Sequence, residues 1–247
     1  MRRVITIGEF DPTARSGVVL DRTTLNGFGL EALTLVNTIK LSDTETAPVS
    51  EEILAAQLSH FIAEEPRSDV KTGRLARRAN IETVASHFED QEMGGVEFVV
   101  DACVDDGPQR PLLKSSALSL VRMRLLPLAT MVIAYQSEAA VLAGVEVTDI
   151  TQMKAAAEAI HVYGGKAVLV RADGPVDDEN VDIFYDDIGH QFLFRGDTGT
   201  EGIRVTRDLF AAALLAYLSQ GRPPTEAIEQ AQKYEARFLT TRREKPA

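Results

Sequence analysis

Hydrophobic positions along the chain follow two alternating patterns. Short, almost continuous apolar runs rich in β-branched residues predict strands at 4–8, 32–39, 96–102, 130–135 and 167–172. Between and after them, apolar residues recur at helical spacing over 50–65, 79–89, 116–125, 151–163, 208–219 and 225–239. Strands that are apolar throughout are typical of a parallel sheet buried on both faces. The pattern therefore predicts an α/β fold with a central, mostly parallel sheet and helices on both faces.

The segment 182–195 departs from this alternation. Two aromatic-rich runs flank Asp186, Asp187 and Gly189, which predicts a hairpin at one edge of the sheet. No repeat, linker or low-complexity stretch divides the chain. We therefore expect one domain over residues 1–247, with a short polar tail near 240–247.

Composition narrows the classes of partner. The 37 acidic residues outnumber the 26 basic ones and give a net charge of −11, which disfavours nucleic acid and anionic membranes. The apolar stretches fall short of the roughly 20 residues that a membrane span needs, and Glu9 and Asp11 interrupt the N-terminal apolar run too early for a signal peptide. Cys103 stands alone and is most simply a buried apolar residue, so no intrachain disulfide can form. We expect a cytoplasmic protein that acts on a small molecule.

Short catalytic signatures are absent from the sequence. Three of the four histidines fall in predicted helices, and none of the four has metal-site spacing; they are His60, His87, His161 and His190. The chain contains no GxSxG elbow, no GxxxxGK[ST] phosphate loop and no GxGxxG fingerprint. Any function must therefore be inferred from a dispersed pattern.

Segments taken in chain order carry such a pattern. They are IGEFDPTARSGVVLD, AAQLSHF, DVKTGRLA, VVDACV, MVIAYQSEAAVLAG, GGKAVLVRADG and VTRDLFAAALLAYLSQG. Together they resemble the ribokinase-like small-molecule kinases, above all the hydroxymethylpyrimidine and phosphomethylpyrimidine kinases of thiamine synthesis and the related pyridoxal kinases. The resemblance spans residues 4–221. It implies a three-layer ribokinase-like fold, a homodimer, ATP and Mg²⁺, and phosphorylation of a hydroxymethyl group on a pyrimidine or pyridine.

The substrate side of the resemblance rests on three positions. DPTARSGVVLD stands where the pyrimidine kinases have a pattern like DPSGGAGIQAD, which implies that Asp21 hydrogen-bonds the substrate ring. The alternative is a helix-capping carboxylate at the start of DRTTLNGFG. Ser42 falls where the family commonly has a glutamine that contacts the pyrimidine, and Glu9 falls where it has a glycine beside the ring. Lys71 matches the family's KxGM segment, whereas Arg74 replaces an apolar residue.

The resemblance also implies positions near the metal and the nucleotide. Asp101 ends a predicted strand at the carboxyl edge of the sheet and resembles the acidic residue that acts near the nucleotide magnesium. Glu138 matches the glutamate of the NxxE motif, in which Tyr135 replaces the asparagine, so it is expected near both metal and nucleotide. The alternative is a first-turn glutamate favoured by the helix dipole. Arg171 replaces a lysine that faces the phosphates.

The catalytic groups of the family gather at one helix start. Phosphoryl transfer to an alcohol needs a base, positive charge across the phosphates, and amides that stabilise the moving charge. Where the family has GTGCT or GTGD, this chain has Val205, Thr206, Arg207 and Asp208. The resemblance implies Asp208 as the general base, Thr206 at the nucleotide and Arg207 on the phosphates. The alternatives are a dipole-stabilised helix carboxylate for Asp208 and a filling ion pair between Arg207 and Asp208.

Replacement of both glycines in this motif leaves two functions open. One is an ATP- and magnesium-dependent kinase; the other is a noncatalytic relative that keeps the fold and acts as a ligand-binding or regulatory protein. Loss of one anion-stabilising donor can slow a reaction by roughly 10² to 10³, so we expect weak or absent turnover of the family's substrates. We also expect four carboxylates to converge at the carboxyl edge of the sheet: Asp21, Asp101, Glu138 and Asp208.

Overall fold

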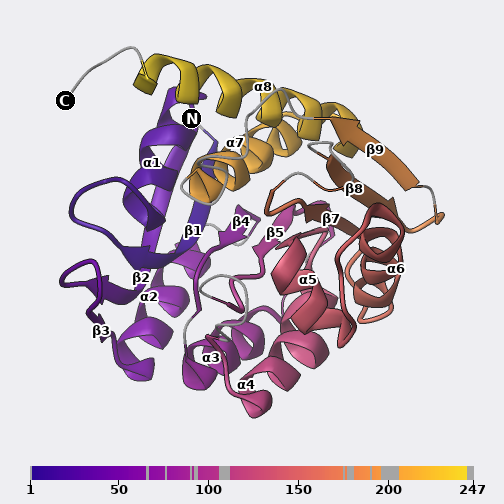
Figure 1. The fold of residues 1–247 in the computed structure, drawn as a ribbon. Coiled ribbons are helices and arrows are strands. Elements are labelled where there is room, and N and C mark those ends of the chain that lie inside the picture. The colour runs from indigo at the N-terminus through magenta and orange to yellow at the C-terminus, as the bar shows by residue number, and fades with distance from the viewer. Residues whose placement is uncertain are drawn as a thin grey trace.

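A nine-stranded sheet runs through the centre of the molecule (Figure 1). The computed structural model describes residues 2–64, 67–75, 77–89, 91, 94–105, 112–174, 176, 181–189, 191–195 and 206–243. The strands are β1 (Arg3–Phe10), β2 (Glu31–Lys40), β3 (Thr46–Pro48), β4 (Asp69–Thr72), β5 (Phe98–Asp101), β6 (Met131–Tyr135), β7 (Ala167–Arg171), β8 (Val181–Asp186) and β9 (Gln191–Arg195).

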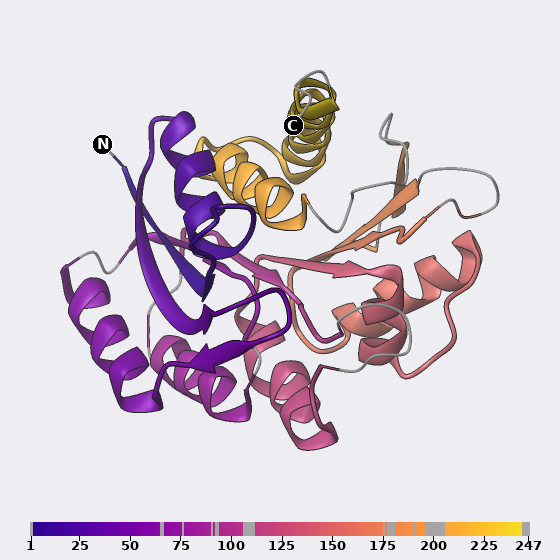
Figure 2. The ribbon, with the colours of Figure 1, turned by 60° about the vertical axis from the view of Figure 1, so that its left-hand side comes forward.

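The order of strands across the sheet is β3-β2-β1-β4-β5-β6-β7-β8-β9. The strands from β2 to β7 in this order run parallel, so their carboxyl ends share one edge. β3 pairs antiparallel with β2 at one end of the sheet, and the antiparallel β8–β9 hairpin closes the other end (Figure 2). This topology brings segments that are distant in sequence to one edge, where open α/β folds place their ligands.

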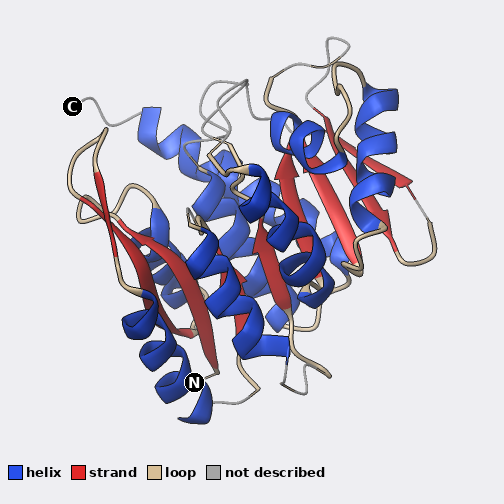
Figure 3. Ribbon diagram, turned by 90° about the horizontal axis from the view of Figure 1, so that it is seen from below, coloured by secondary structure: helices blue, strands red, loops and turns tan. Residues whose placement is uncertain are grey.

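Helices cover both faces of the sheet (Figure 3). They are α1 (Gly17–Gly27), α2 (Glu51–Glu64), α3 (Arg78–Glu89), α4 (Ser115–Leu120), α5 (Gln136–Ala143), α6 (Ile150–His161), α7 (Arg207–Ser219) and α8 (Pro224–Arg243), with a π turn at Val121–Leu125 and a 3₁₀ turn at Leu126–Leu128. α1, α7 and α8 lie on one face, and α2 to α6 lie on the other (Figure 1). The three layers predicted from the apolar pattern are thus confirmed.

Alternation along the buried strands divides the core into two layers. In β5, Val99 packs with the α1, α7 and α8 layer, whereas the next residue, Val100, packs with the α2 to α6 layer. In β7, Leu169 and Val168 divide in the same way. Because successive side chains of a strand point to opposite faces, a continuous apolar run supplies both layers at once. The uninterrupted apolar strands in the sequence follow from this requirement.

Most predicted elements are confirmed with small shifts at their ends. The five predicted strands are β1, β2, β5, β6 and β7, and the segment 182–195 forms the β8–β9 hairpin at the sheet edge. The helix predicted over 116–125 is α4 followed by the π turn. The first part of the predicted polar tail is helical, because α8 continues to Arg243.

β4 and α1, which carry charged residues of the site, were missed by the apolar pattern. β4 has the sequence DVKT, in which only one of four residues is apolar, although all four are buried. α1 has the sequence GVVLDRTTLNG, which begins with glycine and contains β-branched residues of modest helix propensity. Both elements carry charged residues that are buried in the finished fold, so hydrophobic periodicity could not reveal them.

In the part of the chain that the structure describes, we find no helix with both the length and the apolar character needed to cross a membrane.

Candidate active site

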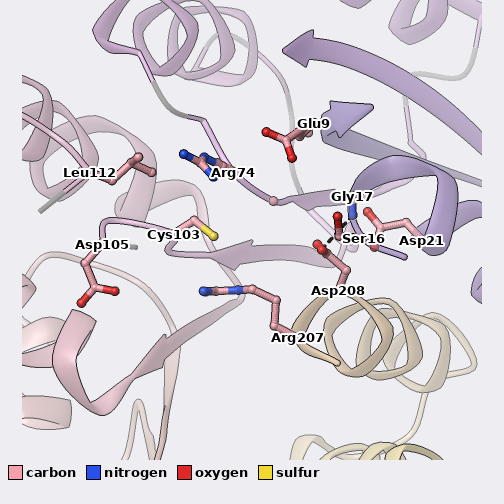
Figure 4. Close-up of a pocket in the computed structure, with 12 residues that line it drawn as sticks. Glu9, Ser16, Gly17, Asp21, Arg74, Cys103, Asp105, Leu112, Arg207 and Asp208 are labelled. Atoms are coloured by element: carbon pink, nitrogen blue, oxygen red, sulfur yellow. Dashed lines mark hydrogen bonds between the residues drawn. The ribbon is translucent and has the colours of Figure 1, made fainter. Parts of the chain in front are cut away.

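A cavity of about 230 Å³ opens at the carboxyl edge of the sheet (Figure 4). Its wall comes from the end of β1, the start of α1, the segments that follow β4 and β5, and the start of α7. The predicted site residues in the lining are Glu9, Asp21, Arg207 and Asp208. The parallel topology therefore gathers residues from both ends of the chain around one small space.

Asp21, Lys71 and Asp208 form a buried charged cluster beside this cavity. The Lys71 ammonium donates to Asp21 Oδ2 at 2.9 Å and to Asp208 Oδ1 at 3.0 Å. Lys71 and Asp21 are almost completely buried, and the Asp208 side chain is 13% exposed. Thr6 on β1 also donates to Asp21 Oδ2. Asp21 lies inside α1, four residues past its start, so the alternative that it caps a helix is wrong.

Burial and neighbouring charges shift the pKa values of Asp21 and Asp208 in opposite directions. Burial raises the pKa of Asp21 to about 7, against the influence of Lys71. Burial acts on Asp208 too, but Lys71 and the Gly17 N–H outweigh it and lower the pKa of Asp208. Burial disfavours the charged form of Lys71, yet the two aspartates raise its pKa. At neutral pH, Asp208 is thus an ionised carboxylate held by an ammonium group.

Gly17 fixes the second oxygen of Asp208. Its N–H donates to Asp208 Oδ2 at 2.8 Å, and its φ of +65° lies in the left-handed region. A Cβ at this position would lie 2.0 Å from the carbonyl oxygen of Glu9. Only glycine can therefore bring this amide to the carboxylate without moving the end of β1.

Arg207 lies between the two carboxylates predicted to act near a metal. Its Nε and Nη2 donate to Asp101 Oδ2 and Oδ1 at 3.0 and 2.6 Å, and its Nη1 and Nη2 donate to Glu138 Oε1 and Oε2 at 2.9 and 3.1 Å. The guanidinium also lies 4.7 Å from the centre of the Tyr135 ring. Figure 4 shows Arg207 and Asp208 pointing in different directions. The expected alternative, an ion pair between Arg207 and Asp208, is therefore not what forms.

A Mg²⁺ ion does not fit the Asp101–Glu138 pair as it stands. All four carboxylate oxygens accept hydrogen bonds from Arg207, and Glu138 Oε2 accepts a further bond from the Tyr135 N–H. Magnesium requires oxygen ligands at about 2.0–2.1 Å in octahedral geometry, and these oxygens are already engaged by a cation. Burial raises the pKa of Glu138 to about 7 despite Arg207. Glu138 is also the first-turn glutamate of α5, so its capping role and its ion pair coexist.

Two carboxylate oxygens of the cavity wall are left for a ligand. Among the described residues, Glu9 Oε2 and Asp21 Oδ1 are buried and have no hydrogen-bond partner. Burial raises the pKa of Glu9 as well. Arg74, which also lines the cavity, acts electrostatically on Glu9 in the opposite direction. Buried acceptors without donors are costly, so this wall is suited to a ligand that donates N–H or O–H groups.

Arg171 and Thr206 belong to a separate buried network. Arg171 pairs with Asp182 at 3.1 Å and with Glu235 at 2.7 Å, and its guanidinium lies 3.7 Å from the Phe210 ring centre. Thr206 donates to Glu235 Oε1 at 2.6 Å. Neither residue lines the cavity in the described structure. The expectation that Arg171 faces phosphates is corrected, because Asp182 and Glu235 supply its counter-charges inside the protein.

Two further residues, Ser42 and Cys103, lie in other surroundings than the sequence predicts. Ser42 is exposed in the β2–β3 connection and accepts a hydrogen bond from Thr44 N, away from the cavity lining. Cys103 lines the cavity and is partly exposed rather than fully buried in the core. Val205 lies outside the described residues. For the described part of the chain, no group of three or more potential metal ligands was found.

The four carboxylates predicted to converge lie in two pairs, and each pair is joined by one cation. Lys71 joins Asp21 to Asp208, and Arg207, next to Asp208 in sequence, joins Asp101 to Glu138. The sequence indicates only that Lys71 matches KxGM and does not predict that it joins the two aspartates. A lysine inside a short buried strand was the available signal, because buried ammonium groups require partners.

A model of one kinase family matches residues 11–244, and its description is phosphomethylpyrimidine kinase. The chain belongs to this phosphomethylpyrimidine kinase family. The hydroxymethylpyrimidine/phosphomethylpyrimidine kinase of Mycobacterium bovis (strain ATCC BAA-935 / AF2122/97) is 30% identical over 239 residues, which cover 92% of this chain and 84% of the relative. A putative pyridoxine kinase of Staphylococcus epidermidis is 32% identical over 252 residues, which cover 96% and 87%.

The fold of this chain is also similar to that of a solved kinase structure. The pyridoxal kinase from Staphylococcus aureus, in complex with AMP-PCP and pyridoxal, matches with a TM-score of 0.77 and 25% identity, covering 94% of this chain and 85% of that one. The ribokinase-like α/β fold predicted from the sequence is confirmed by such neighbours. Glu9 and Arg207, which the resemblance gives as departures from the family's pattern, both line the cavity.

Proposed function

We propose that the chain transfers a phosphoryl group from ATP to a hydroxymethyl group on a pyrimidine or pyridine. The observation that carries the proposal is the ionised Asp208 carboxylate at the start of α7, in a cavity of about 230 Å³ and beside an unpartnered oxygen of Asp21. Family membership and relatives named as kinases of pyrimidine and pyridoxine substrates support it.

Asp208 is the proposed general base. The substrate hydroxyl donates its proton to the carboxylate while its oxygen attacks the γ-phosphorus, and ADP carries away the electrons of the broken P–O bond. Lys71 and the Gly17 amide hold the carboxylate in place and ionised, because both interact more strongly with its charged form. The base is thereby positioned before the substrate arrives.

Asp21 and Glu9 are the proposed contacts to the substrate ring. Each offers a buried oxygen that has no partner among the described residues. An amino substituent or a protonated ring nitrogen would supply the donors that these acceptors lack. Two acidic acceptors favour a ring that carries more than one N–H group or a positive charge. Ser42 lies away from the cavity, so we assign it no contact with the ring.

ATP is the proposed phosphoryl donor, with magnesium as the ion that accompanies its phosphates. The AMP-PCP bound to the similar S. aureus enzyme supports the nucleotide. Asp101 and Glu138 are not assigned as ligands of that ion, because Arg207 engages their oxygens. Arg207 itself lines the cavity and offers a fixed positive charge next to the base.

A second candidate function is ligand binding without turnover. It is favoured by the placement of Arg207, which fills the space between two carboxylates at the helix start where the family places its anion-binding glycines. In that case the cavity and its unpartnered acceptors would still bind a ring. The chain would then act as a binding or regulatory protein.

The two functions are separated by incubating the purified chain with magnesium ATP and one alcohol at a time. The alcohols are hydroxymethylpyrimidine, pyridoxine and pyridoxal, and the phosphorylated product is measured by mass spectrometry. We expect slow product formation that Asp208→Asn abolishes and Asp187→Asn, in the exposed turn of the distant hairpin, leaves unchanged. Ring binding by calorimetry without product would favour the second candidate, and turnover by Asp208→Asn would refute the assigned base.

A further inference from the structure

The ion cluster around Arg207 has the form of a closed cation site. Two carboxylates whose side chains are at most 1% exposed face one another across a single guanidinium that is 12% exposed. The pairing is bidentate on each carboxylate, which is the strongest arrangement that arginine makes with such groups. The Tyr135 ring packs against the guanidinium. Charge, hydrogen bonds and packing all favour a cation in this position.

The cation is attached to the chain, which changes its competition with free ions. Arg207 is the first residue of α7, a helix whose following residues are almost all buried, so the guanidinium stays near the carboxylates. A tethered group competes at an effective concentration in the millimolar range or above. A divalent ion would have to break four charge-assisted hydrogen bonds and also place the displaced guanidinium beside its own double charge.

We propose that Arg207 is a built-in counter-cation that closes the Asp101–Glu138 pair to divalent metal ions. The pair then serves to hold Arg207 at the cavity, and the positive charge at this point does not depend on metal concentration. The same geometry predicts how the protein behaves when Arg207 is replaced. Removing the guanidinium releases four buried carboxylate oxygens from Arg207. Glu138 Oε2 keeps its bond from the Tyr135 N–H, and the pair should become a site for a hard divalent ion.

The inference is tested by titrating the protein with Mn²⁺ in the absence of nucleotide and substrate. Free Mn²⁺ is measured by electron paramagnetic resonance. We expect Arg207→Ala to bind one Mn²⁺ at least about tenfold more tightly than the unmodified protein. Adding Asp101→Asn to that variant should remove the gain. Arg124→Ala is the matched control, because Arg124 pairs with Glu82 and Glu89 on the protein surface rather than with Asp101 or Glu138. It should bind Mn²⁺ as the unmodified protein does.

Mn²⁺ titrations of a second variant and of the unmodified protein provide outcomes that can overturn the inference. Arg207→Gln removes the charge but retains a hydrogen-bonding side chain, so it substitutes if Arg207→Ala does not fold by circular dichroism. The inference is overturned if a folded variant gains no Mn²⁺ affinity. It is also overturned if the unmodified protein binds one Mn²⁺ that Asp101→Asn abolishes, whereas no such site in the unmodified protein supports it. Because these titrations contain no nucleotide or alcohol, failure of the kinase proposal leaves them unaffected.

Discussion

Asp21 has a protonation state that depends on how deeply it is buried. One of its oxygens accepts from Lys71 and Thr6, while the other has no partner among the described residues. Burial raises its pKa to about 7, and Lys71 retains Asp208 as a partner whether Asp21 is protonated or not. The residue proposed to contact the substrate ring can therefore accept a hydrogen bond when ionised or donate one when protonated.

This raised pKa predicts a loss of stability as the pH rises. Between the ordinary value of 3.8 and about 7, folded Asp21 binds a proton that the unfolded chain has released, so raising the pH through this window destabilises the fold. Over this whole window the loss is on the order of 4 kcal/mol, because one pH unit corresponds to about 1.4 kcal/mol for one proton. Urea unfolding in steps from about pH 5 to pH 8 should therefore show a smaller decline for Asp21→Asn than for the unmodified protein.

Glu138 titrates in the same window and provides the comparison. Its pKa is also raised to about 7, so Asp21→Asn should flatten the decline without removing it. Asp208, whose pKa is lowered, contributes stability that is lost only at more acidic pH. An unchanged pH dependence in Asp21→Asn would show that Asp21 is ionised throughout.

The start of α7 is held in place by α8. Glu235 on α8 accepts from Thr206, directly before α7, and pairs with Arg171 at the end of β7. The Phe210 ring on α7 packs against the same guanidinium. One buried carboxylate thus links a strand and two helices immediately behind the proposed base.

Glu235→Ala should therefore destabilise the fold much more than the same change on the exposed side of α8. Removing one partner of a buried ion pair costs about 3–5 kcal/mol, because the other charge remains buried. Glu229 is the matched control, since its side chain is 51% exposed and pairs with Lys233, which is also exposed. Glu229→Ala should change the free energy of unfolding by less than about 0.5 kcal/mol. Similar unfolding midpoints for the two variants in urea would contradict the structural role of Arg171.

Elements whose function is to fill the core could be predicted, whereas elements that carry paired charges could not. β6 and β7 are apolar throughout and were found from the sequence. β4 was missed because Asp69 and Lys71 interrupt it, and their burial is made favourable only by partners far along the chain. The same limit applied to the site. The four carboxylates were predicted to converge, but which cation each would meet depends on side-chain geometry that no motif encodes.

At the scale of the whole molecule, the two ends of the sheet differ. β3 is a three-residue strand, whereas β9 is a five-residue strand whose outer backbone edge is not paired with any described strand. An unpaired edge of this length is a template for a second chain. The resemblance stated from the sequence also implies a homodimer.

We therefore predict that the protein in solution has the mass of two chains. Pairing of the β9 edge across a two-fold axis would remove the exposed backbone groups of both copies. Light scattering during size-exclusion chromatography, at two protein concentrations, measures this mass directly. A single-chain mass at both concentrations would rule the dimer out.

The wide sequence separation of the charged partners also bears on how the protein is made. Asp208 follows Lys71 by 137 residues, and Arg207 follows Asp101 by 106. At about 5–20 residues per second, the ribosome needs roughly 7–27 s between adding Lys71 and adding Asp208. Until α7 emerges, Asp101 and Glu138 have no guanidinium to neutralise them, and dehydrating two bare carboxylates costs several kcal/mol per ion. We therefore expect the carboxyl edge of the nascent sheet to remain hydrated until late in translation. A chain released before α7 is made should expose that edge to proteases.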